Sequence, residues 1–294
     1  MKRSIQLLLT VLTISLVSCE AIDQPEELPS YIQIDSVKVD YKNPSVFGVG
    51  QPNIPDVWLN VNGSEQGIYN LPNTIAIKED GNVDILIRAG IKVNGIAATR
   101  MDYPFYTRFD TTINISDLDT VSFTPTVSYN PNTEVLWKEN FEQSAVTLKR
   151  RQASDVDLER VQVDSIPYKE NYVAYTKIDT GARMHFALTS NNFATNTFVS
   201  APVFIEMDYK ATSTFNVNLI YEDTEGVIEE TPVIYMNPST ENGEAKWNKI
   251  YIDISDRVLA TRNAQRYGIS ISAAHNISNP PAEFYFDNFK LLRL

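Results

Sequence analysis

The sequence has 294 residues and is acidic, with 37 Asp and Glu against 25 Lys and Arg and a formal net charge of −12 at pH 7. This balance argues against nucleic acid and against anionic lipid headgroups as partners. Beyond the N-terminal segment, the sequence has no apolar run of about 20 residues, the length that a transmembrane helix needs. Tyr, Phe, Val, Ile and Thr are abundant and turn residues recur, so the composition predicts an all-β protein. The length favours two domains.

The first 18 residues have the form of a secretion signal. Lys2 and Arg3 give a short positive segment, residues 5–17 are mostly apolar, and the small residue Ser18 follows. The apolar segment is shorter than the about 20 residues that span a bilayer. This combination is typical of a cleaved signal, so we predict that residues 1–18 are removed.

Residues 16–19, LVSC, resemble the lipobox of bacterial lipoproteins. The resemblance implies that the Cys19 thiol takes diacylglycerol and that the mature chain begins there, anchored by acyl chains such as palmitate. Cys19 is the only cysteine, so it cannot form an internal disulfide, and lipidation would remove a reactive exported thiol. Acyl chains contribute about 0.8 kcal/mol per buried methylene, so two or three of them anchor a protein firmly. The alternative is an incidental cysteine behind an ordinary signal.

Residues 19–30 hold four acidic residues and two prolines, and they predict a flexible tether because they have little to bury. An acidic stretch directly after the lipidated cysteine resembles the surface-export signal of Bacteroidota lipoproteins. The resemblance implies a lipid-anchored outer-membrane protein exposed at the cell surface. The periplasmic face of the membrane is the alternative.

Residues 31–130 predict a first β-sandwich. Apolar and polar side chains alternate in short segments at a spacing of about 8–12 residues, which suits a sandwich of about seven strands. The segments are 31–41, 56–62, 74–78, 82–88, 111–115 and 120–127. Residues 57–77, with an Asn62-Gly63 turn and the motif YNLP, resemble PEGA-type and related immunoglobulin-like modules of bacterial surface proteins. The resemblance implies an Ig-like fold.

The aromatic and arginine-rich segment 99–108 is unusual within this domain. Pro104 excludes a central strand, so the segment is expected at a sheet edge or in a loop. Tyr and Arg are frequent anchors of protein interfaces, which makes a partner-binding loop one interpretation. The residues concerned are Arg100, Tyr103, Phe105, Tyr106 and Arg108. The other interpretation is a loop that folds back and caps the open end of the sandwich.

Residues 131–294 predict a second β-sandwich after a linker at Pro131-Asn132. Residues 203–209, 215–219 and 250–254 alternate in the manner of half-buried antiparallel strands. The segments ENFE, KWNKIYIDIS and FYFDNFKLL resemble the galactose-binding-like jelly-roll domains. Such domains serve as carbohydrate-binding modules and as accessory domains of secreted proteins. The resemblance therefore implies a jelly roll and leaves its ligand open.

Catalytic motifs are missing from the sequence, including a nucleophile elbow, a phosphate-binding glycine loop and a zincin motif. His185 and His275 lack metal-ligand spacing, and a lone histidine is more often structural than catalytic. Carboxylates that could form a glycosidase pair are numerous, but the sequence singles none out. We therefore predict a protein that is not an enzyme and requires no cofactor, with a glycan-active enzyme as the weakest alternative.

A structural calcium ion is the best-motivated metal prediction. In jelly rolls of this kind the first and last strands lie side by side, and acidic side chains there often bind a cation. The matching positions are Glu142 and Asp287, with Glu139 in reserve. Ca²⁺ takes about six to eight oxygen ligands, and some would have to be backbone carbonyls. The alternative is that these are ordinary solvated acids on an acidic protein.

Sugar binding would need aromatic platforms with polar neighbours, and the sequence has three tryptophans. Trp247 is expected in the core and Trp137 is expected to be buried near the linker. Trp58 alternates against apolar neighbours, so it could face outward.

Together these features predict a lipid-anchored accessory subunit bound to a larger outer-membrane assembly, such as a transport, secretion or protein-assembly machine. The prediction rests on the segment 100–108 and on a two-domain chain without catalytic motifs. The rival interpretation is a surface glycan-binding lipoprotein that serves polysaccharide uptake.

Overall fold

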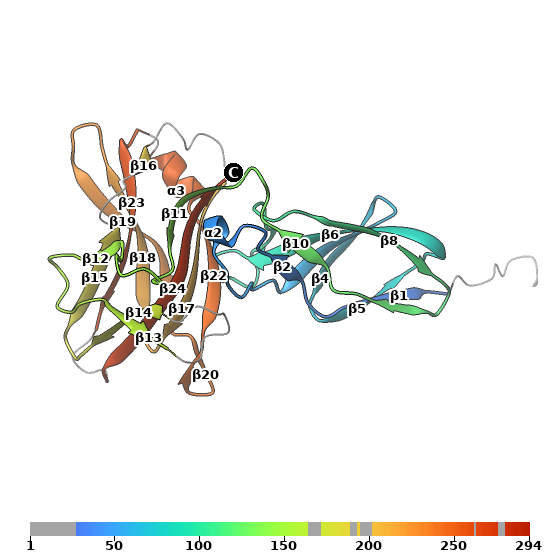
Figure 1. Ribbon diagram of the computed structural model, residues 1–294, viewed down its shortest axis with the longest axis horizontal. Coiled ribbons are helices and arrows are strands. Elements are labelled where there is room, and N and C mark those ends of the chain that lie inside the picture. The colour runs from blue at the N-terminus through green and yellow to red at the C-terminus, as the bar shows by residue number, and fades with distance from the viewer. Residues whose placement is uncertain (1–27, 164–171, 189–192, 195–201, 262, 276–279) are drawn as a thin grey trace, which may run out of the picture.

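The computed structural model describes residues 28–163, 172–188, 193–194, 202–261, 263–275 and 280–294. These residues are almost entirely β, as predicted, and form two β-sandwich domains (Figure 1). The helices of the described chain are short, α2 (Pro44–Phe47) and α3 (Ser255–Ala260). Neither of them has the length and apolar character needed to cross a membrane. The predicted signal, Cys19 and most of the tether lie outside the described residues, so their roles stay predictions.

The first domain packs two layers of strands around an apolar core. One layer has the order β4-β3-β6, with β7 and β8 both paired to the far side of β6, and the other holds β5-β1-β9 and the pair β10-β2. Alternate apolar residues, such as Ile32, Leu59 and Ile85, fill the space between the layers. The strands are β1 (Ser30–Ile34), β2 (Lys38–Asp40), β3 (Asp56–Val61), β4 (Ser64–Asn70), β5 (Asn73–Ile77), β6 (Gly81–Lys92), β7 (Arg100–Asp102), β8 (Phe109–Ile115), β9 (Thr120–Ser122) and β10 (Thr126–Ser128).

Two of the expected strands are each split in two. Segment 31–41 forms β1 and β2, segment 120–127 forms β9 and β10, and the halves pair in parallel, β1 with β9 and β2 with β10. The break in the second segment falls at Pro125, which has no N–H to continue the ladder, although its carbonyl accepts from Lys38 N at 2.9 Å. The domain is therefore a β-sandwich, and its likeness to Ig-like modules stays a prediction.

The second domain packs two larger sheets face to face. One has the order β13-β14-β24-β17-β22 with β11 along β24, and the other has the order β12-β15-β23-β18-β19 with β16 beside β23. The first and last strands of the domain, β11 and β24, are antiparallel neighbours. This is the predicted jelly-roll type of β-sandwich. Its strands are β11 (Glu134–Glu139), β12 (Leu148–Arg150), β13 (Glu159–Gln162), β14 (Tyr172–Ile178), β15 (Arg183–Leu188), β16 (Phe193–Ala194), β17 (Val203–Ala211), β18 (Phe215–Glu222), β19 (Ile228–Met236), β20 (Thr240–Glu241), β21 (Glu244–Ala245), β22 (Asn248–Asp253), β23 (Arg266–Ala274) and β24 (Ala282–Arg293).

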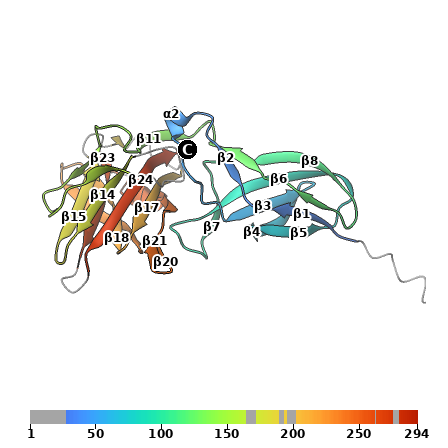
Figure 2. The same ribbon diagram turned by 60° about the horizontal axis from the view of Figure 1, so that its bottom comes forward.

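The last strand is buried on both faces along much of its length. Residues 286–292 of β24 are all buried, although alternation would leave every second side chain in water. The reason is that the first domain covers part of the outer face of this sheet. Figures 1 and 2 show the first domain extending away from the jelly roll on the side of β22 and β24.

Candidate binding face at the domain junction

The outer face of the sheet that contains β17, β22 and β24 has two zones with different side chains. Where the first domain covers the face, it carries four charged residues, here called the junction cluster: Glu206, Asp208, Lys249 and Lys290. Farther from the first domain it carries three rings, here called the aromatic strip: Tyr175, Trp247 and Tyr285. The strand residues of both zones point away from the core because they occupy alternate positions on their strands, and Trp247 lies just before β22.

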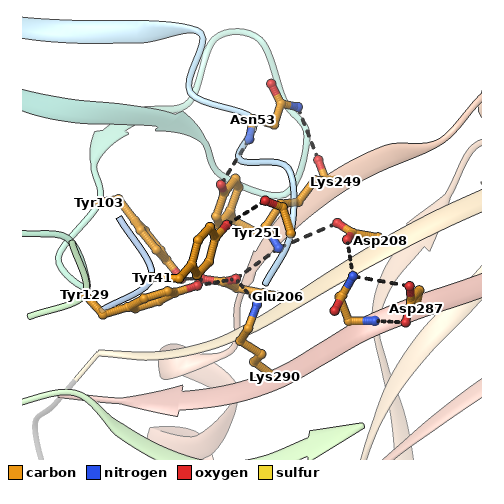
Figure 3. Close-up of polar contacts among 12 residues, drawn as sticks. Tyr41, Asn53, Tyr103, Tyr129, Glu206, Asp208, Lys249, Tyr251, Asp287 and Lys290 are labelled. Carbon is orange, nitrogen blue, oxygen red and sulfur yellow. Dashed lines mark hydrogen bonds and ion pairs between the residues drawn. The ribbon is translucent and has the colours of Figure 1, made fainter. Parts of the chain in front are cut away.

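The junction cluster is a buried network of ion pairs. Lys249 Nζ lies 3.0 Å from Glu206 Oε2 and 3.6 Å from Asp208 Oδ1, and Lys290 Nζ lies 3.2 Å from the same Glu206 oxygen (Figure 3). All four residues are buried. Burying charges is costly, and only partners of opposite sign offset that cost, so each member depends on the others.

Tyrosines of the first domain cover the cluster and form hydrogen bonds to Glu206. Tyr103 Oη donates to Glu206 Oε1 at 2.8 Å, and Tyr129 Oη contacts both carboxylate oxygens at 3.0 and 2.9 Å. The Tyr103 ring also packs edge to face on Phe204 and Tyr251, with centroids 5.6 and 4.8 Å apart. Hydrogen bonds and aromatic packing therefore connect the two domains directly.

Burial and charge shift the pKa values of these groups in opposing directions. Burial alone would raise the pKa of Glu206, but the charges of Lys249 and Lys290 outweigh it and hold the pKa at about 2. Burial would lower the pKa of Lys249, and the carboxylates of Asp208 and Glu206 raise it well above its ordinary value instead. Burial, reinforced by Glu206, raises the pKa of Tyr103. At neutral pH the cluster therefore holds an ionised Glu206 beside a charged Lys249 and a protonated phenol.

β22 is the last strand of its sheet, so one of its edges has no neighbouring strand. Two loops of the first domain form hydrogen bonds to residues of this strand. Asn94 N donates to Tyr251 O at 2.8 Å, and Asn94 Oδ1 accepts from Asp253 N at 3.0 Å. Asn53 Nδ2 donates to Lys249 O at 3.2 Å. Unpaired strand edges attract other chains, so this arrangement both protects the edge and fixes the angle between the domains.

The aromatic strip runs across neighbouring strands on the uncovered part of the same face. The ring centroids of Trp247 and Tyr285 are 6.4 Å apart, and those of Tyr285 and Tyr175 are 4.8 Å apart. Lys210 Nζ lies 5.1 Å from the Tyr285 centroid, and Tyr175 Oη donates to Glu283 Oε1 at 3.3 Å. The three rings are half-buried. A ligand with an apolar face can stack on such a row of rings.

Amide side chains surround the end of the strip that meets the first domain. A pocket of about 220 Å³ is lined by Gln51, Pro52, Asn53, Trp247, Asn248 and Lys249. An adjoining cavity of about 290 Å³ shares Asn53, Asn248 and Lys249 and extends to Tyr209, Tyr235 and Asn237. Both domains therefore contribute hydrogen-bonding groups next to the indole of Trp247, at a domain boundary where ligand sites are common.

The structure places the aromatic residues of segment 99–108 at the contact between the two domains. As Pro104 predicted, the segment leaves the edge strand β7 and continues as a loop. However, Tyr103, Phe105 and Tyr106 are only 3%, 0% and 7% exposed. They are buried because the partner that they contact is the second domain of the same chain, which is closer to the capping interpretation.

The two arginines of the predicted partner-binding set stay at the surface. The side chains of Arg100 and Arg108 are 35% and 65% exposed. Arg100 Nε lies 3.7 Å from Asp56 Oδ2, and Arg108 donates to Asp110 at 3.0 Å. The structure thus separates the arginines from the aromatic residues with which the sequence grouped them.

The two predicted calcium ligands have separate protein partners. Glu142 Oε1 accepts from Tyr172 N at 2.9 Å, and Asp287 Oδ1 accepts from Asn288 N at 2.7 Å. The reserve ligand Glu139 accepts from nearby backbone N–H groups. In the part of the chain that the structure describes, no three His, Cys, Asp or Glu side chains are grouped as metal ligands. The structure supplies no ligand set for calcium, which stays a prediction.

Both histidines have protein partners on or near the other sheet. His185 Nε2 lies 3.0 Å from Glu230 Oε1, which also accepts from Asn218 Nδ2 at 3.0 Å. His275 is buried and contacts the carbonyl of Pro280.

Sequence reasoning missed the junction cluster and misplaced Trp247. Glu206 and Asp208 alternate with apolar residues, which is also the pattern of a solvated strand face. Lys249 and Lys290 interrupt two other apolar strands in the same way. Charged residues of opposite sign within apolar strands could have indicated a buried ion-pair cluster. Trp247 was expected in the core and is half-buried at the surface, whereas Trp137 is buried as expected.

No protein-family model and no curated protein matches this sequence. Solved structures that resemble it include carbohydrate-binding modules. A xylan-binding family 22 module from Paenibacillus barcinonensis is 15% identical, with a TM-score of 0.38 over 54% of this chain and 94% of that chain. A structure described under the promiscuous specificity of β-sandwich carbohydrate-binding modules is 12% identical, with a TM-score of 0.39 over 91% and 99%. A family 27 module from Caldicellulosiruptor saccharolyticus, solved with mannohexaose, is 13% identical, with a TM-score of 0.35 over 55% and 97%. At TM-scores this low, we infer neither a ligand nor binding residues from these structures.

Proposed function

We propose that this chain is a lipid-anchored, non-enzymatic protein of the outer membrane that binds a glycan on the aromatic strip of its second domain. The observation that carries the proposal is a row of three half-buried rings beside a pocket lined by amides of both domains. Sugar rings present apolar C–H faces together with hydroxyl groups. They are therefore matched by aromatic planes next to side chains that both donate and accept hydrogen bonds.

The residues around the strip favour a neutral glycan. Gln51, Asn53 and Asn248 are exposed amides at one end of the strip, and each can donate to one hydroxyl and accept from another. Lys210 and Glu283 lie beside the rings and add one charge of each sign. Because the whole chain carries a net charge of −12, a polyanionic sugar would be repelled.

The first domain gives the glycan-binding face a fixed position relative to the proposed anchor. Strand β1 begins at the end of the first domain farthest from the jelly roll (Figure 1). If acyl chains on Cys19 hold the tether at the membrane, the first domain acts as a spacer that holds the jelly roll away from the lipid. The junction cluster then keeps the binding face from rotating.

The rival function, an accessory subunit of an outer-membrane assembly, has less support. The aromatic residues that motivated it are occupied within the chain, and only Arg100 and Arg108 of that set remain exposed. Purification of the tagged protein from gently solubilised outer membranes tests the rival directly. Stoichiometric recovery of an integral membrane partner, lost when both arginines are replaced by alanine, would favour it.

A glycan array tests the proposed function. We expect the wild-type chain to bind a neutral oligosaccharide and Trp247→Ala and Tyr285→Ala to lose that binding. Tyr31→Ala is the matched control, because Tyr31 is half-buried in β1 of the first domain. Binding that survives both strip substitutions, or is lost equally in the control, would contradict the proposal.

Cell fractionation tests the anchor separately. Cys19→Ser should move the protein from the membrane fraction to the soluble fraction while leaving glycan binding unchanged, because the lipid and the strip are independent. A protein that stays in the membrane without Cys19 would contradict the lipid-anchor prediction.

A further inference from the structure

Asp208 on β17 and Lys249 on β22 face each other inside the junction cluster. They are direct partners in the antiparallel pairing of these strands, and their side chains are 0% and 3% exposed. Lys249 Nζ lies 3.6 Å from Asp208 Oδ1, which is too long for a hydrogen bond, and 3.0 Å from Glu206 Oε2. The two side chains therefore face each other in a buried position without a direct hydrogen bond between them (Figure 3).

We propose that Lys249 and Asp208 become joined by an intramolecular amide bond that cross-links β17 to β22, with Glu206 transferring the protons. Lys249 Nζ lies 3.6 Å from Asp208 Oδ1, which is bonded to the carbon that the amine would attack, and the paired strands hold the two side chains next to each other. The Asp208 and Lys249 side chains are 0% and 3% exposed, and tyrosines of the first domain cover the neighbouring Glu206. Condensation also removes two buried charges, which a low-dielectric interior favours.

Glu206 is placed to carry protons between the two reacting groups. Its Oε2 lies 3.0 Å from Lys249 Nζ, and it shares one face of β17 with Asp208, two residues away. Two phenols and Lys290 hold its carboxylate in place. Lys290 has this holding role rather than a reacting one, because its direct strand partner is Glu206, whereas the direct strand partner of Lys249 on β17 is Asp208.

The reaction balances without an oxidant or a co-reactant. The Lys249 ammonium gives one proton to Glu206, which passes it to Asp208 Oδ1, so that a neutral amine faces a neutral carboxyl group. The amine nitrogen attacks Asp208 Cγ, and Asn288 Nδ2, which donates to Asp208 Oδ2 at 3.0 Å, stabilises the charge that develops on that oxygen. A second proton passes from nitrogen through Glu206 to Oδ1. The Cγ–Oδ1 bond then breaks, one water leaves, and the net charge of the site is unchanged.

Tryptic peptide mapping of the folded, then denatured, wild-type chain tests the cross-link. Asp208 lies in the tryptic peptide 184–210, and an unmodified Lys249 would end the peptide 247–249. An amide at Lys249 blocks cleavage there. We therefore expect peptide 184–210 joined to peptide 247–257, with a mass one water below the sum of the two. Cleavage after Lys290 should be normal and serves as an internal control from the same cluster.

Peptides 184–210 and 247–249 at their sequence masses would overturn the proposal, as would a cross-link to Lys290 instead. Asp208→Ala should restore cleavage after Lys249, whereas Lys246→Arg, at a neighbouring exposed lysine, should leave the cross-linked product unchanged. Glu206→Gln keeps both reacting groups. At a time when all wild-type chains are cross-linked, most Glu206→Gln chains should still lack the cross-link. Cross-linking of Glu206→Gln at the wild-type rate would overturn the role of Glu206. The wild-type digest decides the cross-link even if a variant fails to fold.

Discussion

The two zones of the outer jelly-roll face invert the usual distribution of side chains. In the covered zone four charged residues are buried, and in the uncovered zone three aromatic rings are partly exposed. Buried charges and exposed rings are the informative exceptions on a protein surface, because folding alone favours neither. The difference teaches that one continuous sheet face can hold a domain in place at one end and offer a ligand surface at the other.

The junction cluster in the covered zone stabilises the fold only when all four of its charged residues are present. Each lysine is compensated by Glu206 or Asp208, and Glu206 in turn is held by phenols of the first domain. The uncovered zone has no such dependence, because its rings contact one another at the surface. Substitutions should therefore change stability in one zone and binding in the other.

The largest expected effect comes from removing Glu206. Glu206→Ala leaves Lys290 without its carboxylate partner, and breaking a buried pair in this way costs about 3–5 kcal/mol. Urea denaturation should show that loss in the free energy of unfolding. Glu244→Ala, at an exposed carboxylate of β21, is the control and should change it by less than about 0.5 kcal/mol. Equal effects of the two substitutions would mean that the junction cluster contributes no more stability than an exposed carboxylate does.

A smaller loss is expected when one phenol that covers the cluster is removed. Tyr103→Phe and Tyr129→Phe keep the rings and delete only the hydroxyl groups that donate to Glu206. Hydrogen bonds to charged groups contribute about 1.5–3 kcal/mol, so the free energy of unfolding of each variant, measured by urea denaturation, should fall by that margin. Tyr235→Phe, on a ring that is 73% exposed, should match the wild type. A neutral result for both Tyr103→Phe and Tyr129→Phe would mean that the junction does not depend on these hydrogen bonds.

A further expected effect is a pH dependence that belongs to the covered zone. Burial would raise the pKa of Glu206, but the charges of Lys249 and Lys290 prevail before any cross-link forms and lower it from 4.5 to about 2, and Lys290 still lowers it after cross-linking. Because the pKa is lower in the folded state, the stabilisation is complete above pH 4.5 and is lost as the pH falls toward 2. Over that window we expect the urea midpoint of the wild type to fall more steeply than that of Glu206→Gln. Parallel curves would contradict the ionised state of Glu206.

The sequence predicted the strands well because the alternation of apolar and polar residues indicates which side chains face the core. Residues 203–209 lie in β17, and residues 250–253 lie in β22, with the predicted apolar residues inside. Alternation cannot say what covers the opposite face. That cover depends on contacts such as Tyr103 with Glu206, which are 103 residues apart in the chain.

The candidate site could be predicted only in part, for a related reason. The composition of segment 100–108 indicated an interface, but only the fold shows that the partner is the chain's own second domain. Trp137 and Trp247 both have apolar residues nearby in the sequence, so the sequence does not distinguish them. Their different burial follows from their positions in the fold. Trp137 lies in β11 against Phe289 of the core, whereas Trp247 precedes the edge strand β22.

The most direct test of the division between the zones measures glycan affinity and unfolding free energy in the same two variants, Trp247→Ala and Tyr103→Phe. For a glycan identified on the array, we expect Trp247→Ala to lose at least about tenfold in affinity, or about 1.4 kcal/mol, because it removes a stacking surface. Tyr103→Phe should keep wild-type affinity while losing stability. Wild-type affinity in Trp247→Ala, or a tenfold loss in folded Tyr103→Phe, would contradict the assignment of binding to the aromatic strip.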